Sequence, residues 1–211
     1  MYSKIWIFDF DGTLVSSNKI KKKGFYRVIQ KTKKSFAYMD EILESSIKGR
    51  SNIFKLYEEK MNNFSLPVEN YRLLTEKYSD LIDHLVACAP QITGAEALLN
   101  TLKRKKKIIM LSSATPEKNL KNIIENRKWS KYFDVISGMP KTKKKFIKEV
   151  ILAYNIKASK ICVVGDGLDD RSSAEEYGCN FLPVGNLNKL DSGYEIKNII
   201  SLIENRKIFY D

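Results

Sequence analysis

The sequence is poor in the residues that build disulfide frameworks and sulfur or imidazole metal clusters. Its 211 residues include three cysteines and one histidine. Cys88, Cys162 and Cys179 form no CxxC pair, and Cys162 lies in an apolar run, so we expect buried, reduced thiols in a cytoplasmic protein. His84 has no partner motif, and we expect it at the surface near a helix end rather than in catalysis.

Long apolar runs, low-complexity tracts and internal repeats are also missing. No stretch approaches the length needed to span a membrane, and the run from Ile5 to Phe8 is too short for a signal peptide. The hydrophobic fraction of 43% is ordinary for a globular protein. These observations exclude disordered, fibrous and membrane-spanning classes and predict a folded soluble protein.

Acidic residues are the scarcer charged type. The net charge is +12, and lysine runs at 19–23, 103–107 and 141–145 contribute to it. Such a balance can attract nucleic acid, anionic membranes or phosphorylated small molecules. The aromatic residues show no RNP-like or zinc-finger spacing, so we interpret most lysines as solvated surface and do not expect a nucleic acid or membrane partner.

Short apolar runs alternate with helical patterns over much of the chain. Continuously apolar runs indicate strands buried on both faces, which are typical of a parallel sheet. Helical patterns follow Thr115-Pro116 and Thr142, two N-cap signals, and a short helix is expected over 173–177 before Gly178. The sequence therefore predicts an α/β fold, a doubly wound parallel sheet with helices on both faces. The strands are expected at 5–8, 107–111, 134–137, 161–165 and 180–184.

Residues 16–88 interrupt this alternation. They contain no buried-strand run and carry helical patterns instead, the clearest over 71–85, with a second that Ser51 could cap. We predict a small helical domain at 16–88, inserted after the first strand of a core formed by 1–15 and 89–211.

Polar side chains follow the ends of the predicted strands. Asp9 and Asp11 follow the first strand, Ser112 and Ser113 the second, the 141–145 lysines the third, and Asp166 and Asp170 the fourth. The carboxyl ends of parallel strands meet at one edge of a sheet, where ligands bind. Clustered carboxylates need a cation such as Mg²⁺, and lysine and serine beside it favour a phosphate. A carboxylate can also act as a nucleophile toward phosphorus.

Three motifs in register resemble the haloacid dehalogenase superfamily, in particular its Mg²⁺-dependent phosphatases of the phosphoglycolate phosphatase and β-phosphoglucomutase type. They are DFDGT at 9–13, IIMLSSATP at 108–116 and GDGLDD at 165–170. The resemblance implies a Rossmann-like core and a type-one helical cap at 16–88 that selects the substrate.

The resemblance implies a role for each acid. Asp9 attacks phosphorus, and Asp11 protonates the leaving alcohol and then activates water. Dehalogenases of the superfamily lack an acid two residues after the nucleophile, so Asp11 argues for phosphoryl transfer. Mg²⁺ would be held by the Asp9 carboxylate, the Asp11 backbone carbonyl and Asp166, with Asp170 supporting them from outside the ligand set. Gly12 allows a tight turn, and Thr13 braces the loop.

The phosphate-binding residues need a choice between neighbours. SATP, 113–116, is similar to the family's SxSP-like form, so we favour Ser113 over Ser112. Many relatives have Lys-Pro at the lysine motif, whereas this chain has Met139-Pro140. Lys143, beside the expected cap Thr142, fits the alternative form, and Lys141 is the second choice.

The segment 47–51 is similar to the cap loop that sugar-phosphate members point at the leaving group, and Arg50 in it could contact the substrate. We expect a cytoplasmic Mg²⁺-dependent phosphatase acting on a small phosphomonoester, such as a sugar phosphate or phosphoglycolate. A β-phosphoglucomutase-type phosphomutase is the alternative, although the DGT form and Val15-Ser16-Ser17 are closer to the hydrolases. A non-catalytic or nucleic-acid-binding protein is the third reading, and the sequence is silent on oligomeric state.

Overall fold

The computed structural model describes residues 3–45, 47, 49–63, 69–187, 191–192, 196 and 199–200. The chain divides into two compact units, one formed by residues 1–16 and 89–211 and the other by residues 17–88. The function of the second unit as a cap stays a prediction. Lys48 of the proposed cap loop and residues 201–211 of the proposed core lie outside the described residues.

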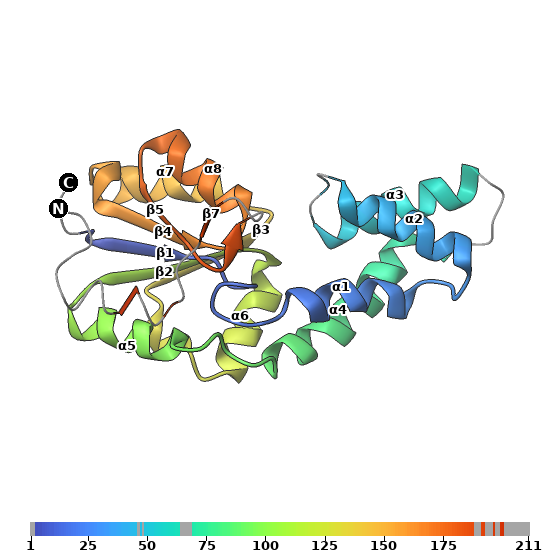
Figure 1. Ribbon diagram of the computed structural model, residues 1–211, viewed down its shortest axis with the longest axis horizontal. Coiled ribbons are helices and arrows are strands. Elements are labelled where there is room, and N and C mark those ends of the chain that lie inside the picture. The colour runs from blue at the N-terminus through green and yellow to red at the C-terminus, as the bar shows by residue number, and fades with distance from the viewer. Residues whose placement is uncertain are drawn as a thin grey trace. The chain divides into compact units, whose positions relative to one another are not determined.

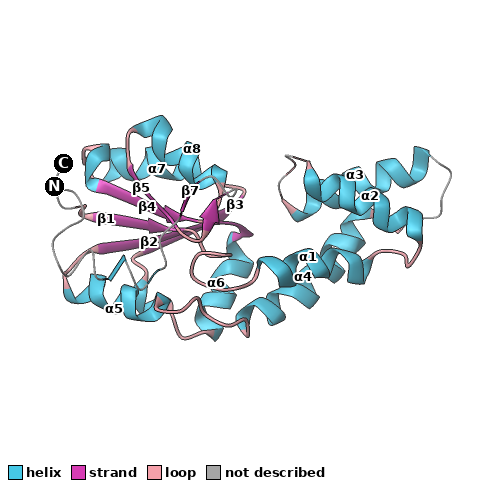
Figure 2. Ribbon diagram, viewed as in Figure 1, coloured by secondary structure: helices cyan, strands magenta, loops and turns pink. Residues whose placement is uncertain are grey.

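A five-stranded sheet forms the centre of the first unit (Figures 1 and 2), with strand order β3-β2-β1-β4-β5 and parallel pairing throughout. Phe8 at the end of the central strand pairs with Leu111 on one side and with Val164 on the other. The doubly wound α/β fold expected from the sequence is confirmed. The strands are β1 (Ile5–Phe8), β2 (Ile108–Pro116), β3 (Val135–Met139), β4 (Ile161–Gly165) and β5 (Asn180–Pro183).

Helices cover both faces of the sheet, with α7 and α8 on one face and α5 and α6 on the other (Figure 1). Each of these helices lies in the chain between two strands of the parallel sheet, whose strands need crossover connections. Two short 3₁₀ turns and a small antiparallel pair also belong to this unit. The bounds are α5 (Ala95–Arg104), α6 (Glu117–Asn126), η1 (Ser130–Tyr132), α7 (Lys143–Ala153), η2 (Ala158–Lys160), α8 (Leu168–Tyr177), β6 (Asn186–Leu187) and β7 (Asp191–Ser192).

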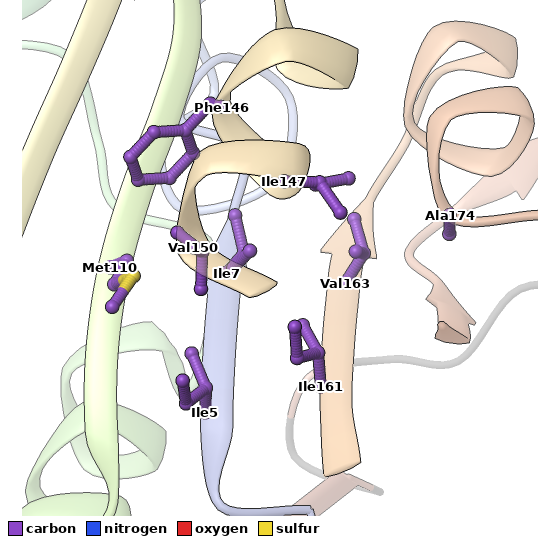
Figure 3. Packing of buried hydrophobic residues seen from close by; sticks show 9 residues of the cluster. All are labelled: Ile5, Ile7, Met110, Phe146, Ile147, Val150, Ile161, Val163 and Ala174. Carbon is purple, nitrogen blue, oxygen red and sulfur yellow. The ribbon is translucent and has the colours of Figure 1, made fainter. Parts of the chain in front are cut away.

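All four residues of β1 are buried, because helices cover both faces of the strand. On one face Ile5 and Ile7 pack with apolar side chains of β2, β4, α7 and α8 (Figure 3). Burying a large aliphatic side chain stabilises a fold by roughly 1.5–3 kcal/mol. The end of β1 is therefore a rigid point from which the following loop starts. The cluster in Figure 3 contains Ile5, Ile7, Met110, Phe146, Ile147, Val150, Ile161, Val163 and Ala174.

Some of the expected helix ends are confirmed and others are wrong. The Thr142 side chain accepts a hydrogen bond from the Lys145 backbone N–H at the start of α7, and Gly178 ends α8 in the left-handed region with φ +71°. Thr115 is not an N-cap, because β2 continues to Pro116 and α6 begins at Glu117. Ser51 is not a cap either, since α3 begins at Arg50.

The second unit is helical. Aromatic rings at its centre join three helices. The centroid of the Phe25 ring lies 4.3 Å from that of Tyr78 and 5.3 Å from that of Phe54. A Cβ at Gly24 would lie 2.3 Å from Ile82 Cδ1, so glycine permits the close approach of α1 to α4. The bounds are α1 (Asn18–Val28), α2 (Lys33–Glu44), α3 (Arg50–Asn63) and α4 (Tyr71–Ala87).

Cysteine and histidine, the residue types that are scarce in this sequence, lie at ordinary positions in the structure. Cys162 is buried in β4 as expected, but Cys88 is exposed because it follows the last turn of α4. His84 lies exposed in that last turn, as expected. Among the described helices none is both long and apolar enough to cross a bilayer.

Candidate active site

The loop after β1 carries the first two acids. The Asp9 backbone N–H donates to the Val164 carbonyl oxygen at 2.9 Å, so Asp9 stays aligned with the end of β4, and it is 7% exposed. The chain then turns sharply at Gly12, where φ is +81° and the backbone N–H donates to the Val15 carbonyl oxygen at 2.8 Å. A side chain would be strained at this angle, which agrees with the expected role of Gly12.

Lys143 brings a positive charge to the carboxyl edge of the sheet. It is the first residue of α7, and its Nζ lies 3.0 Å from Asp9 Oδ1, 2.5 Å from Asp170 Oδ1 and 3.7 Å from Asp169 Oδ2. Lys141 pairs instead with Glu149 at 2.5 Å. Of these two lysines, the structure therefore brings Lys143 and not Lys141 to the acids.

Three carboxylates lie close enough to share one cation. Oxygen atoms of Asp9, Asp166 and Asp170 fall within 4.8 Å of one another. The Thr13 hydroxyl donates to Asp166 Oδ1 at 3.2 Å, and the Gly167 backbone N–H donates to Asp170 Oδ2 at 3.1 Å. These oxygens suit a hard divalent cation such as Mg²⁺, so the donor set fits the metal that the sequence predicts.

A glycine makes room for Asp170 in this cluster. A Cβ at Gly165 would lie 2.2 Å from Asp170 Cγ, a distance that no side chain tolerates. Asp170 is 2% exposed, and its carboxylate contacts both Lys143 and the Gly167 amide. The family resemblance implies that Asp170 supports the ligand set from outside it, whereas its oxygen lies within the same cluster as those of Asp9 and Asp166.

The electrostatics of the cluster show an excess of negative charge. Burial, together with the charges of Asp170 and Asp11, raises the pKa of Asp9 to about 7 despite the opposing effect of Lys143. Burial also raises the pKa of Asp170. Although burial alone would lower the pKa of Lys143, the carboxylates of Asp9 and Asp170 raise it above its usual value. One ammonium does not balance this many acids, and a divalent cation would stabilise their ionised forms.

Asp11 points to a different set of partners. Its Oδ2 accepts hydrogen bonds from the hydroxyls of Ser113 at 3.3 Å and Thr115 at 3.2 Å. Ser113 Oγ in turn accepts from the Thr115 backbone N–H at 3.1 Å. Ser112 is buried and pairs in register with Ser137 of β3. The structure thus brings Ser113, the favoured serine, to the acids.

Sequence reasoning missed Thr115 and Asp169 at this site. The Thr115-Pro116 pair predicts a helix cap, although Thr115 also stands two residues after Ser113. In an extended strand that spacing directs both side chains to the same face, which is a signal that could have found it. Asp169 is adjacent to Asp170 and carries an exposed carboxylate near Lys143. Its position in GDGLDD offered no separate signal.

Arg50, the candidate in the helical unit, has partners within that unit. Its Nη1 donates to Ser79 Oγ at 2.8 Å and to Asp83 Oδ1 at 3.2 Å, and the guanidinium lies 5.3 Å from the centre of the Tyr78 ring. The side chain is 8% exposed. These contacts join the start of α3 to α4, and contact of Arg50 with a substrate stays a prediction.

Comparison with known proteins gives the family. A family model described as haloacid dehalogenase-like hydrolase matches residues 6–184. The chain belongs to the haloacid dehalogenase-like hydrolases, and the resemblance carried by its three motifs is confirmed. A search among curated proteins returned no significant match.

Solved structures share the fold over nearly their whole length. YfnB from Bacillus subtilis, bound to magnesium, aligns with a TM-score of 0.75 at 12% identity over 97% of this chain and 100% of its own. A predicted phosphoglycolate phosphatase from Haemophilus somnus 129pt gives 0.71 at 15% over 97% and 98%. CbbY from Rhodobacter sphaeroides, in complex with phosphate, gives 0.66 at 14% over 90% of each chain. At these identities the likeness establishes a common fold.

Proposed function

We propose that this hydrolase is a Mg²⁺-dependent phosphatase that removes the phosphoryl group from a small phosphorylated metabolite, such as a sugar phosphate or phosphoglycolate. The observation that carries the proposal is the buried Lys143 ammonium among the carboxylates of Asp9, Asp169 and Asp170 at the carboxyl edge of the sheet. Magnesium and phosphate, the two ligands that this charge pattern suits, occur in the similar structures of YfnB and CbbY.

In the first proposed step a carboxylate oxygen of Asp9 attacks phosphorus. The bond between phosphorus and the leaving oxygen breaks as the bond to Asp9 forms, which gives an aspartyl-phosphate. Asp11, as the carboxylic acid, donates its proton to the leaving alkoxide. Lys143 and Ser113 would hold the phosphoryl oxygens, since an ammonium and a hydroxyl can both donate to them.

In the second step water replaces Asp9. Asp11, now a carboxylate, accepts a proton from the water as its oxygen attacks phosphorus, and the bond from phosphorus to Asp9 breaks. Inorganic phosphate leaves, and both acids return to their starting forms. One residue acting first as acid and then as base follows from microscopic reversibility.

The metal would be held by Asp9 and Asp166, with Asp170 beside them and the Asp11 backbone carbonyl as the ligand that the family resemblance implies. When bound, Mg²⁺ supplies positive charge that neutralises phosphoryl oxygens. The chain's own residues supply the nucleophile, the proton and the orientation. Residues 17–88 would form the cap that selects the substrate, in a cytoplasmic enzyme.

The test is phosphate release from p-nitrophenyl phosphate and from a panel of phosphometabolites that includes phosphoglycolate and hexose phosphates. We expect turnover with Mg²⁺, loss of turnover with excess EDTA, and recovery when Mg²⁺ is restored. Asp9→Asn should lower kcat by at least about 10³-fold, because the proposed first step depends on the Asp9 carboxylate as nucleophile. Turnover that ignores EDTA or survives in Asp9→Asn would overturn the proposal. Conversion of a β-hexose 1-phosphate into the 6-phosphate without free phosphate would indicate a phosphomutase instead.

A further inference from the structure

Thr115 lies beside the proposed acid and base, and its hydroxyl has an unexpected partner. The residue is 2% exposed at the end of β2, directly before the Pro116 that precedes α6. A threonine at such a place normally accepts a hydrogen bond from the first turn of the helix. Here Pro116 takes the N-cap position without a side-chain cap, and the Thr115 hydroxyl donates to Asp11 Oδ2 at 3.2 Å.

The backbone of Thr115 is held in place by its neighbours. A Cβ at Gly138 of β3 would lie 2.4 Å from the Thr115 carbonyl oxygen, so only glycine permits the two strands to approach this closely. On the other side, the Thr115 N–H donates to Ser113 Oγ at 3.1 Å. Thr115 therefore offers its hydroxyl to Asp11 from a fixed position.

Ser113 donates to the same oxygen of Asp11, at 3.3 Å. A serine hydroxyl has one proton to donate. If Ser113 turns that proton to a phosphoryl oxygen, as the proposed function requires, it can no longer donate to Asp11. The Thr115 hydroxyl donates to the same Oδ2 at 3.2 Å, and it would keep this hydrogen bond to Asp11.

We propose that Thr115 is a positioning residue that orients Asp11 for proton transfer while the substrate occupies Ser113. This inference rests on the proposed function, and it deepens that function by assigning a residue that holds the acid. Hydrogen bonds to Oδ2 make that oxygen the acceptor, so the transferable proton belongs on Oδ1. The carboxyl group is thereby held in one orientation toward the leaving alcohol.

The experiment compares two leaving groups in Thr115→Val, which keeps the shape of threonine and removes its hydroxyl. An alkoxide needs a proton as it leaves, whereas p-nitrophenolate is stable enough to leave without one. General acids contribute about 10²–10⁴-fold to rates, and a misoriented acid should lose part of this. We expect kcat/KM to fall about 10-fold for the best alkyl phosphate of the panel and less than about 2-fold for p-nitrophenyl phosphate.

Thr115→Ser is the matched control, because it restores the hydroxyl and should return the alkyl-ester kcat/KM to within about 3-fold of wild type. Thermal unfolding of both variants reports any loss of fold. A general loss of active enzyme would lower kcat/KM equally for the two esters. Equal effects on the two esters, or no effect on either, overturn the inference while a Mg²⁺-dependent wild type leaves the proposed function standing. Wild-type enzyme that hydrolyses neither ester overturns the proposed function and the inference together.

Discussion

Two buried cations, Lys143 in the sheet unit and Arg50 in the helical unit, have contrasting surroundings. Their side chains are similarly hidden, at 12% and 8% exposure. Lys143 contacts Asp9, Asp169 and Asp170, which follow β1 and β4 in separate parts of the chain. Arg50 contacts Asp83, Ser79 and the Tyr78 ring, which all belong to the single helix α4.

Burial of a cation therefore does not by itself indicate function. Around Arg50 one guanidinium meets one carboxylate, and the pair serves to join two helices. Around Lys143 the carboxylates outnumber the ammonium, and such an arrangement is costly unless another cation enters. The excess of acids marks the sheet unit as the place where a metal and an anionic substrate can meet.

Replacing Lys143 by methionine should have the larger effect. The variant keeps the side-chain length but leaves Asp9 and Asp170 buried without their ammonium, which costs about 3–5 kcal/mol of stability when a buried pair is broken. Phosphate release should also fall by about 10²-fold or more, because a donor to the phosphoryl group is lost. Urea unfolding and steady-state kinetics measure both effects.

The metal dependence of this variant sharpens the comparison. Mg²⁺ should recover part of the stability lost in Lys143→Met, because it supplies charge to the same carboxylates. Lys141→Met is the matched control, since Lys141 pairs with Glu149 at the surface, and it should unfold and turn over nearly as wild type does. Equal behaviour of the two variants would contradict the role given to Lys143.

Replacing Arg50 by methionine should have an intermediate effect on stability and little on chemistry. The variant removes two hydrogen bonds, but Asp83 is 21% exposed and keeps some solvation, so we expect a cost of about 1–2 kcal/mol. Mg²⁺ should not recover it. A rise in KM for the best metabolite, without a matching change for p-nitrophenyl phosphate, would instead show that Arg50 contacts the substrate.

An effect no larger than that of Arg50→Met is expected in the pH dependence of the response to Mg²⁺. Because burial raises the pKa of Asp9 from 3.8 to about 7, the folded protein binds this proton more tightly than the unfolded chain. Asp9 therefore makes stability fall as pH rises between those values. Mg²⁺ must displace the proton, so its stabilisation should be about 1–2 kcal/mol greater at pH 8 than at pH 5.5. Thermal unfolding measures the difference, which should shrink in Asp9→Asn.

The sheet and its loops could be predicted from the sequence because local signals agreed with the fold. β1 and β4 have the expected bounds. Their uninterrupted apolar runs can be buried on both faces only inside a sheet that helices cover on both sides. Thr142 caps α7 and so fixes where Lys143 starts the helix. The order of the motifs along the chain then determines which side chains reach one edge of a parallel sheet.

Predictions from the sequence were incomplete where a side chain had two possible partners. Thr115 could cap α6 or meet Asp11, and the second partner lies 104 positions away in the chain. The predicted strand ends at 111 because Ser112, Ser113 and Thr115 are polar. In the structure β2 runs on to Pro116. Arg50 likewise finds Ser79 and Asp83 through helix packing, which no motif encodes.

The central claim is that Asp9 forms a bond to phosphorus, and Asp11→Asn tests it most directly. Without Asp11 as a base the second step should slow, while p-nitrophenolate still leaves in the first. We predict a burst of about one p-nitrophenolate per enzyme. Acid quenching and peptide mass analysis should find the phosphoryl group on Asp9. Slow turnover with no burst and no adduct, or an adduct on another residue, would contradict the account.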